Sequence, residues 1–281
     1  VRRVRVRLGE KFILIYRLSR LDLSEDGSTW DESVHLAKKS EEAGATIINT
    51  GIGWHEARVP TIVTSVPRAA FTDVTARLKG EVSLPLVTTN RINMPDVAEK
   101  VLSEGQADMV SMARPFLADA DLVRKAAEGR VEEINTCIAC NQACLDHTFS
   151  GKLTTCLVNP RACYETELTY VKTAAPKRLA VVGAGPAGLA FATVAAERGH
   201  KVTLFDSDDK IGGQFNVAKR IPGKEEFYET LRYFQRQIDV LEIDLRLGTR
   251  VGADELIKQG FDDVIIATGV KPRTPKIEGI D

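Results

Sequence analysis

A glycine-rich turn between a predicted strand and a predicted helix most strongly constrains the fold of residues 177–281. The apolar residues 178–182 predict a buried strand, and Gly183-Ala-Gly185-Pro-Ala-Gly188 follows directly and opens a helical pattern. The first glycine permits a tight turn, the second lets the backbone approach a pyrophosphate, and the third lets the helix pack on the strand. Phosphate charge would lie at the helix N-terminus. We therefore predict a Rossmann-like dinucleotide-binding unit.

The dinucleotide is predicted from the residues that follow. Asp206 ends the next strand, where a carboxylate can accept hydrogen bonds from ribose hydroxyls. FAD and NAD share this motif, but Ile211-Gly-Gly-Gln-Phe215 and Ala267-Thr-Gly269 are similar to motifs of two-dinucleotide flavoprotein reductases and favour FAD over NAD. A glycine turn without a ligand is the structural alternative. The predicted FAD-binding residues are Gly183, Gly185, Ala187, Gly188, Asp206 and Gln214.

Residues 11–130 alternate between strand-like and helical patterns, which predicts βα units with a parallel sheet. The expected strands cover 12–16, 46–50, 84–89 and 108–112, and the expected helices cover 29–43, 69–79, 94–104 and 118–128. Four units fit half of a (β/α)8 barrel or a small doubly wound sheet. The barrel is favoured because residues suited to chemistry follow each strand, where such barrels have their active sites: Arg17, 51–55, 90–91 and 113–114.

Four of the five cysteines lie within twenty residues, between two segments of βα pattern. Cys137, Cys140 and Cys144 occupy one short loop and Cys156 follows, which suits a [4Fe-4S] cluster whose fourth ligand returns from a second loop. Structural zinc is the alternative, although it more often uses two separated CxxC pairs. Cys163 is expected to be a small buried hydrophobe. The predicted domains are a half barrel over 1–130, a cluster linker over 131–176 and part of an FAD-binding domain over 177–281.

Composition excludes several other classes of protein. The 38 Lys and Arg residues and 39 Asp and Glu residues give a net charge of −1, without the basic footprint of a nucleic-acid or membrane-surface binder. No apolar run has the length of a membrane span. The few, clustered cysteines indicate a reducing compartment, and we expect a cytoplasmic protein. Because the chain begins at Val1 and ends directly after a short loop, we expect an internal fragment of a longer chain.

The chain resembles the bacterial NADPH-dependent 2,4-dienoyl-CoA reductases, iron-sulfur flavoenzymes of the old yellow enzyme class. The resemblance runs along nearly the whole chain and is most specific in Gly-Trp-His-Glu-Ala-Arg58 and in the cysteine segment. Further matching stretches are Ile15 to Ser19, Thr46 to Gly53, Leu86 to Asn93, Met109 to Ala118, Leu157 to Ala162 and Val181 to Asp206.

The resemblance implies an FMN-binding TIM barrel, a [4Fe-4S] cluster, an FAD domain and an NADPH domain. It implies that electrons pass from NADPH through FAD, cluster and FMN to a conjugated dienoyl thioester in unsaturated fatty-acid β-oxidation. Arg17, Arg91, Ala113 and Arg114 would contact FMN, and Cys137, Cys140, Cys144 and Cys156 would bind the cluster. His55 would assist protonation, and His55, Glu56, Ala57 and Arg58 would line the substrate site. By position alone, a lone histidine such as His55 is equally well explained as structural.

The family's first barrel half, with the tyrosine that pairs with the histidine, and its NADPH site are expected to lie outside these 281 residues. We expect the residues alone not to reduce substrate. The alternatives are a related iron-sulfur flavoprotein of the enoate reductase or amine dehydrogenase type, an electron-transfer subunit with FAD but no FMN, and a zinc-stapled binding module. The expected partners are a 2,4-dienoyl-CoA and the remaining parts of the same chain, not nucleic acid or a membrane.

Overall fold

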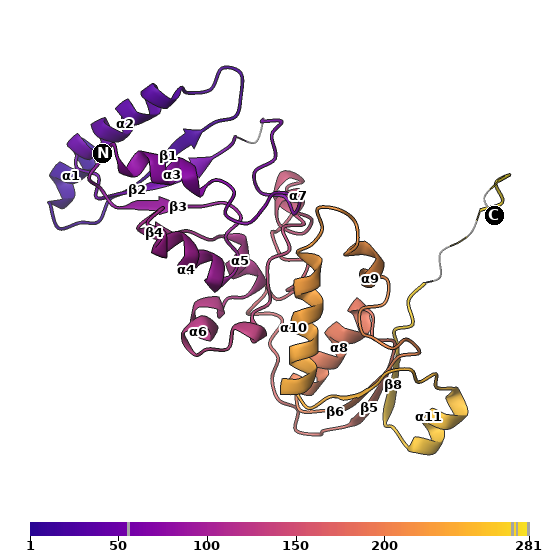
Figure 1. Ribbon diagram of the computed structural model, residues 1–281. Helices are drawn as coiled ribbons and strands as arrows, with labels where there is room; N and C mark the ends of the chain where they lie inside the picture. The colour runs from indigo at the N-terminus through magenta and orange to yellow at the C-terminus, as the bar shows by residue number, and fades with distance from the viewer. Residues whose placement is uncertain (55–56, 271–272, 274, 280–281) are drawn as a thin grey trace. The chain divides into compact units, whose positions relative to one another are not determined.

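The computed structural model describes residues 1–54, 57–270, 273 and 275–279, which form two compact units. The first unit contains Val1–Glu165 together with Pro222–Glu226, and the second contains Thr166–Ile221 and Phe227–Asp281 (Figure 1). The cysteine-rich segment therefore folds largely with the first unit. No helix in these ranges is long and apolar enough to cross a membrane.

The first unit is built on a parallel sheet in the strand order β1-β2-β3-β4. Its strands are β1 (Ile15–Leu21), β2 (Ile47–Ile52), β3 (Leu86–Thr88) and β4 (Met109–Val110). Its helices are α1 (Arg2–Leu8), α2 (Trp30–Glu42), α3 (Thr72–Lys79), α4 (Pro95–Ser103), α5 (Arg114–Ala118), α6 (Leu122–Ala127) and α7 (Leu145–Phe149), with a 3-10 turn η1 (Val131–Glu133). Sequential parallel strands joined by helices confirm the predicted βα units.

Helices cover one face of this sheet. Leu18, Ile48 and Leu86 are buried against residues of α2 and α3, such as Ala37 and Leu78. The opposite face carries a register row that joins Arg17, Asn49, Val87 and Met109 across the four strands. Because side chains alternate along a strand, this row points away from the helix-covered core.

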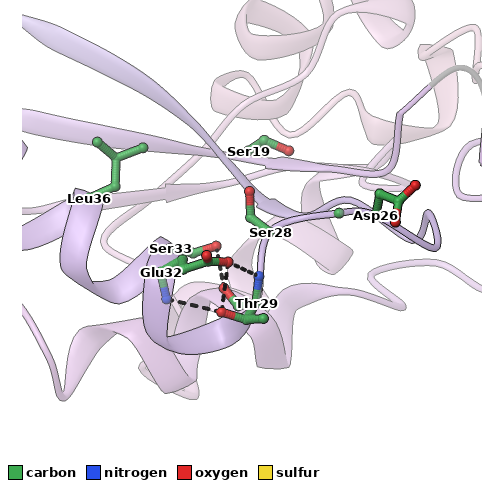
Figure 2. Close-up of a pocket in the computed structure, with 8 residues that line it drawn as sticks. Ser19, Asp26, Ser28, Thr29, Glu32, Ser33 and Leu36 are labelled. Atoms are coloured by element: carbon green, nitrogen blue, oxygen red, sulfur yellow. Dashed lines mark hydrogen bonds between the residues drawn. The ribbon is translucent and has the colours of Figure 1, made fainter.

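Local capping sets the limits of α2. The Thr29 hydroxyl accepts a hydrogen bond from the Glu32 amide at 3.3 Å, and the Glu32 carboxylate accepts one from the Thr29 amide at 2.9 Å, which completes a capping box (Figure 2). Gly44 follows the helix with φ of +94°, a conformation that favours glycine.

Two predicted elements differ in the structure. β1 begins at Ile15 rather than at residue 12. Arg17 therefore lies within the strand, whereas the sequence predicted that it would follow the strand. The apolar run from Phe12 was misleading because Phe12 and Ile13 are exposed, and the buried positions are Leu18 and Arg20. The helix expected over 118–128 begins later, as α6 at Leu122, and the separate short helix α5 ends at Ala118. Asp119 adopts an extended conformation between them and accepts a hydrogen bond from the Asp121 amide at 3.0 Å.

The second unit has a parallel sheet in the order β7-β6-β5-β8. Its strands are β5 (Arg178–Val182), β6 (Lys201–Phe205), β7 (Asp244–Arg246) and β8 (Asp263–Ile266), and its helices are α8 (Pro186–Glu197), α9 (Phe215–Ala218), α10 (Phe227–Val240) and α11 (Ala253–Gln259). β5 pairs with both β6 and β8, so the strand order reverses direction beside β5. Doubly wound sheets bind ligands at such a point, beyond the carboxyl ends of the strands.

Candidate cofactor sites

Four cysteine thiols line a single cavity in the first unit. Cys137, Cys140 and Cys144 come from one loop, and Cys156 comes from the following segment, as the spacing predicts. The remaining lining is mostly apolar, apart from Arg114 and Asn141: Leu117, Ile138, Ala139, Leu157 and Val158. Cys163 does not line this cavity and is exposed, so the expectation of a buried Cys163 is wrong. Its backbone φ of +64° places it in a turn rather than in the core.

Asparagine side chains hold the two cysteine segments together. Asn135 Nδ2 donates to the Val158 carbonyl at 2.7 Å and so joins the chain before Cys137 to the chain after Cys156. Asn159 Nδ2 donates to the Leu117 carbonyl at 2.9 Å and joins the second segment to α5. These bonds satisfy buried backbone oxygens and fix both loops around the cavity.

Backbone amides point at the sulfur atoms. The Ala139 amide donates a hydrogen bond to the Cys137 sulfur, and the Gln142 amide donates one to the Cys140 sulfur. The Val158 and Asn159 amides donate to the Cys156 sulfur. Amide hydrogens stabilise a sulfur that carries negative charge, and hydrogen bonds to sulfur tune iron-sulfur clusters. The backbone of the loop therefore stabilises the charged, thiolate form of these cysteines.

Burial favours the protonated form of three of these thiols. Burial raises the pKa of Cys137 and Cys140 and raises the pKa of Cys156 to about 11. The charge of Arg114 partly opposes this effect at Cys137. Because a metal binds the thiolate, loading this cavity must release protons and supply positive charge.

The four thiols do not converge on a single point. Within the described ranges, no three His, Cys, Asp or Glu side chains come together closely enough to hold one metal ion. Four sulfurs around one zinc at about 2.3 Å would lie only about 3.8 Å from one another. A cubane cluster places each thiolate on a different iron and so needs a wider set of thiols than one zinc ion does.

The three arginines predicted to contact FMN have different surroundings. Arg17 is exposed on the open face of the sheet, opposite Asn49, whose buried Oδ1 has no partner among the described residues. Arg114 donates through Nη1 to Asn141 Oδ1, inside the cysteine loop, and Ala113 beside it is exposed. Arg91 is buried and faces an acidic partner instead, Glu226, to which Nη2 donates at 2.6 Å.

The loop that carries the predicted histidine is anchored at the carboxyl end of β1. Trp54 Nε1 donates to Asp22 Oδ1 at 2.5 Å, and the Ser28 amide donates to Asp22 Oδ2 at 2.7 Å. Burial would raise the pKa of Asp22, but its hydrogen bonds from Ser19, Ser28 and Trp54 outweigh it and lower the pKa.

The predicted substrate residues His55 and Glu56 lie outside the described residues, whereas Ala57 and Arg58 line a small open pocket with Leu23, Ser24 and Glu25. A larger open pocket nearby, drawn in Figure 2, is lined by Ser19 and by residues at the start of α2. Its Thr29 and Glu32 are engaged in the helix cap, so it presents few unused polar groups.

The glycine turn of the second unit leaves no room for a side chain at Gly183 or Gly188. Gly183 has φ of +113°, and a Cβ on it would lie 2.3 Å from the Ala267 carbonyl oxygen. A Cβ on Gly188 would lie 1.8 Å from the Gly183 oxygen, so α8 packs directly on the turn. Asp206 Oδ2 accepts a hydrogen bond from the Ala184 amide at 2.6 Å and fixes the turn against β6.

An open pocket lies at this point of the sheet, where the strand order reverses. It brings together most of the predicted dinucleotide residues, namely Gly183, Gly185, Ala187, Asp206 and Gln214, with Ala267, Thr268 and Gly269 after β8. Gly188 packs beneath the turn and does not line the pocket. Gln214 Nε2 donates to the Val270 carbonyl, which joins the two later motifs.

Both units match families of flavoproteins. Residues 1–133 match the NADH:flavin oxidoreductase / NADH oxidase family, and residues 177–281 match the pyridine nucleotide-disulphide oxidoreductase family. These matches support the expected old yellow enzyme class of flavoproteins, with a TIM-barrel-type domain matched over residues 1–133 and a dinucleotide-binding segment matched over residues 177–281.

Particular relatives differ in their named reactions. The chain is 40% identical to a metal reductase of Desulforamulus reducens, covering 98% of this chain and 42% of that protein. It is 33% identical to an NADH oxidase of Thermoanaerobacter brockii, covering 100% of this chain and 44% of that one. A solved complex of 2-naphthoyl-CoA reductase with 2-naphthoyl-CoA superimposes with a TM-score of 0.95 at 38% identity, over 99% of this chain and 43% of that chain. The chain thus spans less than half the length of these relatives.

Proposed function

We propose that this chain is the central part of an NADPH-dependent 2,4-dienoyl-CoA reductase that holds FMN, a [4Fe-4S] cluster and FAD. The observation that carries the proposal is the cavity lined by Cys137, Cys140, Cys144 and Cys156, with backbone amides directed at three of its sulfurs. A parallel sheet of βα units precedes this cavity in the chain and a dinucleotide pocket follows it, which is the order of FMN, cluster and FAD regions that the resemblance implies.

The substrate class is supported by two observations. The Gly51-Ile-Gly-Trp-His-Glu-Ala-Arg58 loop resembles that of the dienoyl-CoA reductases. The solved structure of high similarity was obtained with a CoA thioester, 2-naphthoyl-CoA, in which the thioester is conjugated to unsaturated carbon. We therefore propose that the substrate is an α,β-unsaturated acyl-CoA.

The residues of this chain have separate roles in the proposal. The bound cluster would carry single electrons between flavins, which exchange one or two. The four cysteines would hold it, and Arg114 would place positive charge beside it. Asp206 would hold the glycine turn in the shape that accepts the pyrophosphate of FAD. His55 would donate a proton to the reduced substrate, and Asp22 would fix the adjacent Trp54.

The test begins with the cofactor content of the full-length protein. Iron, acid-labile sulfide and released flavins are measured, and we expect a [4Fe-4S] complement with one FMN and one FAD per chain. NADPH oxidation is then followed with a 2,4-dienoyl-CoA and with cinnamate as separate electron acceptors, and reduction of the flavins is followed with dimethylamine as an electron donor. Turnover only with the dienoyl-CoA supports the proposal. Zinc in place of iron, or FAD without FMN, would contradict it.

An amine dehydrogenase is the second candidate, because named relatives of this kind also align along nearly the whole chain. An N,N-dimethylglycine/sarcosine dehydrogenase of Chromohalobacter salexigens is 32% identical over 96% of this chain and 40% of that protein. Reduction of the flavins by a secondary or tertiary methylamine, with no oxidation of NADPH by dienoyl-CoA, would favour this candidate.

A further inference from the structure

A buried carboxylate in the first unit is bound by three side chains. Glu226 Oε2 accepts a hydrogen bond from Arg68 Nη2 at 2.6 Å, and Oε1 accepts from Arg68 Nε at 2.8 Å. Oε1 also accepts from Arg91 Nη2 at 2.6 Å, and Oε2 accepts from Asn93 Nδ2 at 3.1 Å. The side chains of Glu226 and Arg91 are only 6% and 3% exposed, so water does little to solvate their charges.

The origin of this carboxylate is unusual. Glu226 ends the segment Pro222–Glu226, which belongs to the first unit although the chain before and after it belongs to the second. Burying an ionised carboxylate is costly unless opposite charge and hydrogen bonds compensate. Two guanidinium groups and one amide supply that compensation here, which fixes the position of Glu226.

Asn93 connects this carboxylate to the cysteine loop. Its Nδ2 donates to Glu226 and also donates to the backbone carbonyl oxygen of Cys137 at 2.9 Å. A carboxylate and a carbonyl are acceptors only, so the amide nitrogen of Asn93 must face both of them. Asn93 is 2% exposed, and in the described part of the chain its Oδ1 has no hydrogen-bond partner. The orientation of the amide is therefore set by Glu226 and Cys137.

Cys137 is the only one of the four cavity cysteines that is buried; the other three are half-buried. Beside it, the Thr136 hydroxyl donates to Met94 Sδ at 3.0 Å, so this part of the loop is held from inside the unit. Fixing the carbonyl of Cys137 fixes its peptide plane and limits the positions open to its sulfur.

We propose that Glu226 is a positioning residue for the cluster, acting through Asn93 on the first of the four cysteines. The inference rests on the proposed function in one respect, that Cys137 ligates a cluster. Residues that orient metal ligands without touching the metal commonly change metal affinity by about 10–100-fold when replaced. We expect a loss of that order from breaking this connection.

The experiment compares three single variants of the full-length protein: Glu226→Gln, Asn93→Ala, and Glu225→Gln as the matched control. Glu225 is exposed, and its replacement by Gln is the same chemical change one residue away. Asn93→Ala leaves the arginine bonds of Glu226 in place, so it tests the link to Cys137 even if Glu226→Gln folds poorly. Cluster loss is followed by visible absorption after addition of an iron chelator, and FAD content reports on the second unit.

We expect both variants to lose the cluster at least about ten-fold faster than wild type, with FAD retained and with Glu225→Gln unchanged. Glu226→Gln should also shift the midpoint potential of the cluster to a more positive value, because removal of a carboxylate makes the local charge more positive. Asn93→Ala should shift it less. Cluster loss at the wild-type rate in both variants would overturn the proposal.

Faster cluster loss in Glu226→Gln but not in Asn93→Ala would show that Glu226 does not act through Asn93. Neither result affects the proposed function, which fails separately if wild-type protein contains no iron and sulfide.

Discussion

Trp54 donates its indole hydrogen to Asp22 Oδ1 over 2.5 Å, which ties the residue before His55 to the carboxyl end of β1. Asp22 also accepts hydrogen bonds from the Ser28 amide and the Ser19 hydroxyl. One carboxylate thus joins the end of β1, the segment before α2 and the loop after β2.

Replacement of Asp22 by Asn should therefore impair turnover more than folding. One oxygen that accepted N–H bonds becomes an amide donor, and we expect a cost of about 1–3 kcal/mol in the stability of the Trp54 anchor. In the full-length protein, kcat with the preferred acyl-CoA should fall about ten-fold or more while iron and flavin contents stay constant. Asp26→Asn is the control, because Asp26 is exposed in the same segment. Equal kcat values for the two variants would show that the anchor does not serve the reaction.

The ligand set of the cavity gives a second prediction. Cys156→Ser should abolish the cluster, because a hydroxyl is a much weaker ligand for iron than a thiolate and the other three thiols come from the opposite loop. Cys163→Ser changes an exposed residue that does not line the cavity and should retain full iron and sulfide. Iron and sulfide assays on anaerobically purified full-length protein decide the point. Iron loss in Cys163→Ser would contradict this ligand assignment.

The glycine turn gives a third prediction. A methyl group on Gly188 would lie 1.8 Å from the Gly183 oxygen, so Gly188→Ala must separate α8 from the turn. We expect destabilisation of about 1–3 kcal/mol and loss of FAD. Gly252→Ala is the control, because a Cβ there meets no atom within 4 Å. Released FAD and the midpoint of thermal unfolding are measured for both. Full FAD content in Gly188→Ala would show that the turn tolerates a side chain.

The sequence predicts elements well where one period of apolar residues dominates. β5 and β6 have the limits that their apolar runs predict, and α2 begins at its capping residue Thr29. β1 was misplaced because its buried face includes Arg20, a charged residue that periodicity assigns to the surface. The helix expected over 118–128 begins only at Leu122 because Asp119 satisfies neighbouring donors locally, and a break of this kind does not disturb helical periodicity.

For the sites, sequence spacing places Cys137, Cys140 and Cys144 on one loop, and the structure adds Cys156 to the lining of the same cavity. The spacing does not reveal Glu226 or Asn93. Glu226 stands in the charged stretch Gly223-Lys-Glu-Glu226, which is typical of a solvated helix start, and its partner Arg91 lies 135 residues away. Asn93 follows the predicted FMN residue Arg91 and carries no spacing signal of its own. Such long-range buried pairs depend on tertiary packing.

The pH dependence of stability gives a fourth prediction. Burial would raise the pKa of Glu226, but hydrogen bonding and charge from Arg68, followed by those of Arg91, outweigh burial and lower the pKa below its ordinary value of 4.5. A group with a lowered pKa in the folded state stabilises the protein fully above its ordinary pKa, and this stabilisation is lost as pH falls through the folded value. Glu226 should therefore contribute its full stabilisation near pH 7 and progressively less below about pH 4.5.

Chemical denaturation of full-length wild type and Glu226→Gln should be compared from pH 7 to pH 3. The difference between their midpoints should be constant down to about pH 4.5 and then shrink, because protonation of Glu226 removes the same charge as the substitution. Exposed Glu225→Gln should differ little from wild type over the whole range. A difference for Glu226→Gln that grows on acidification would mean that the carboxylate is already protonated near neutral pH, and that Arg68 and Arg91 do not hold it in its charged form.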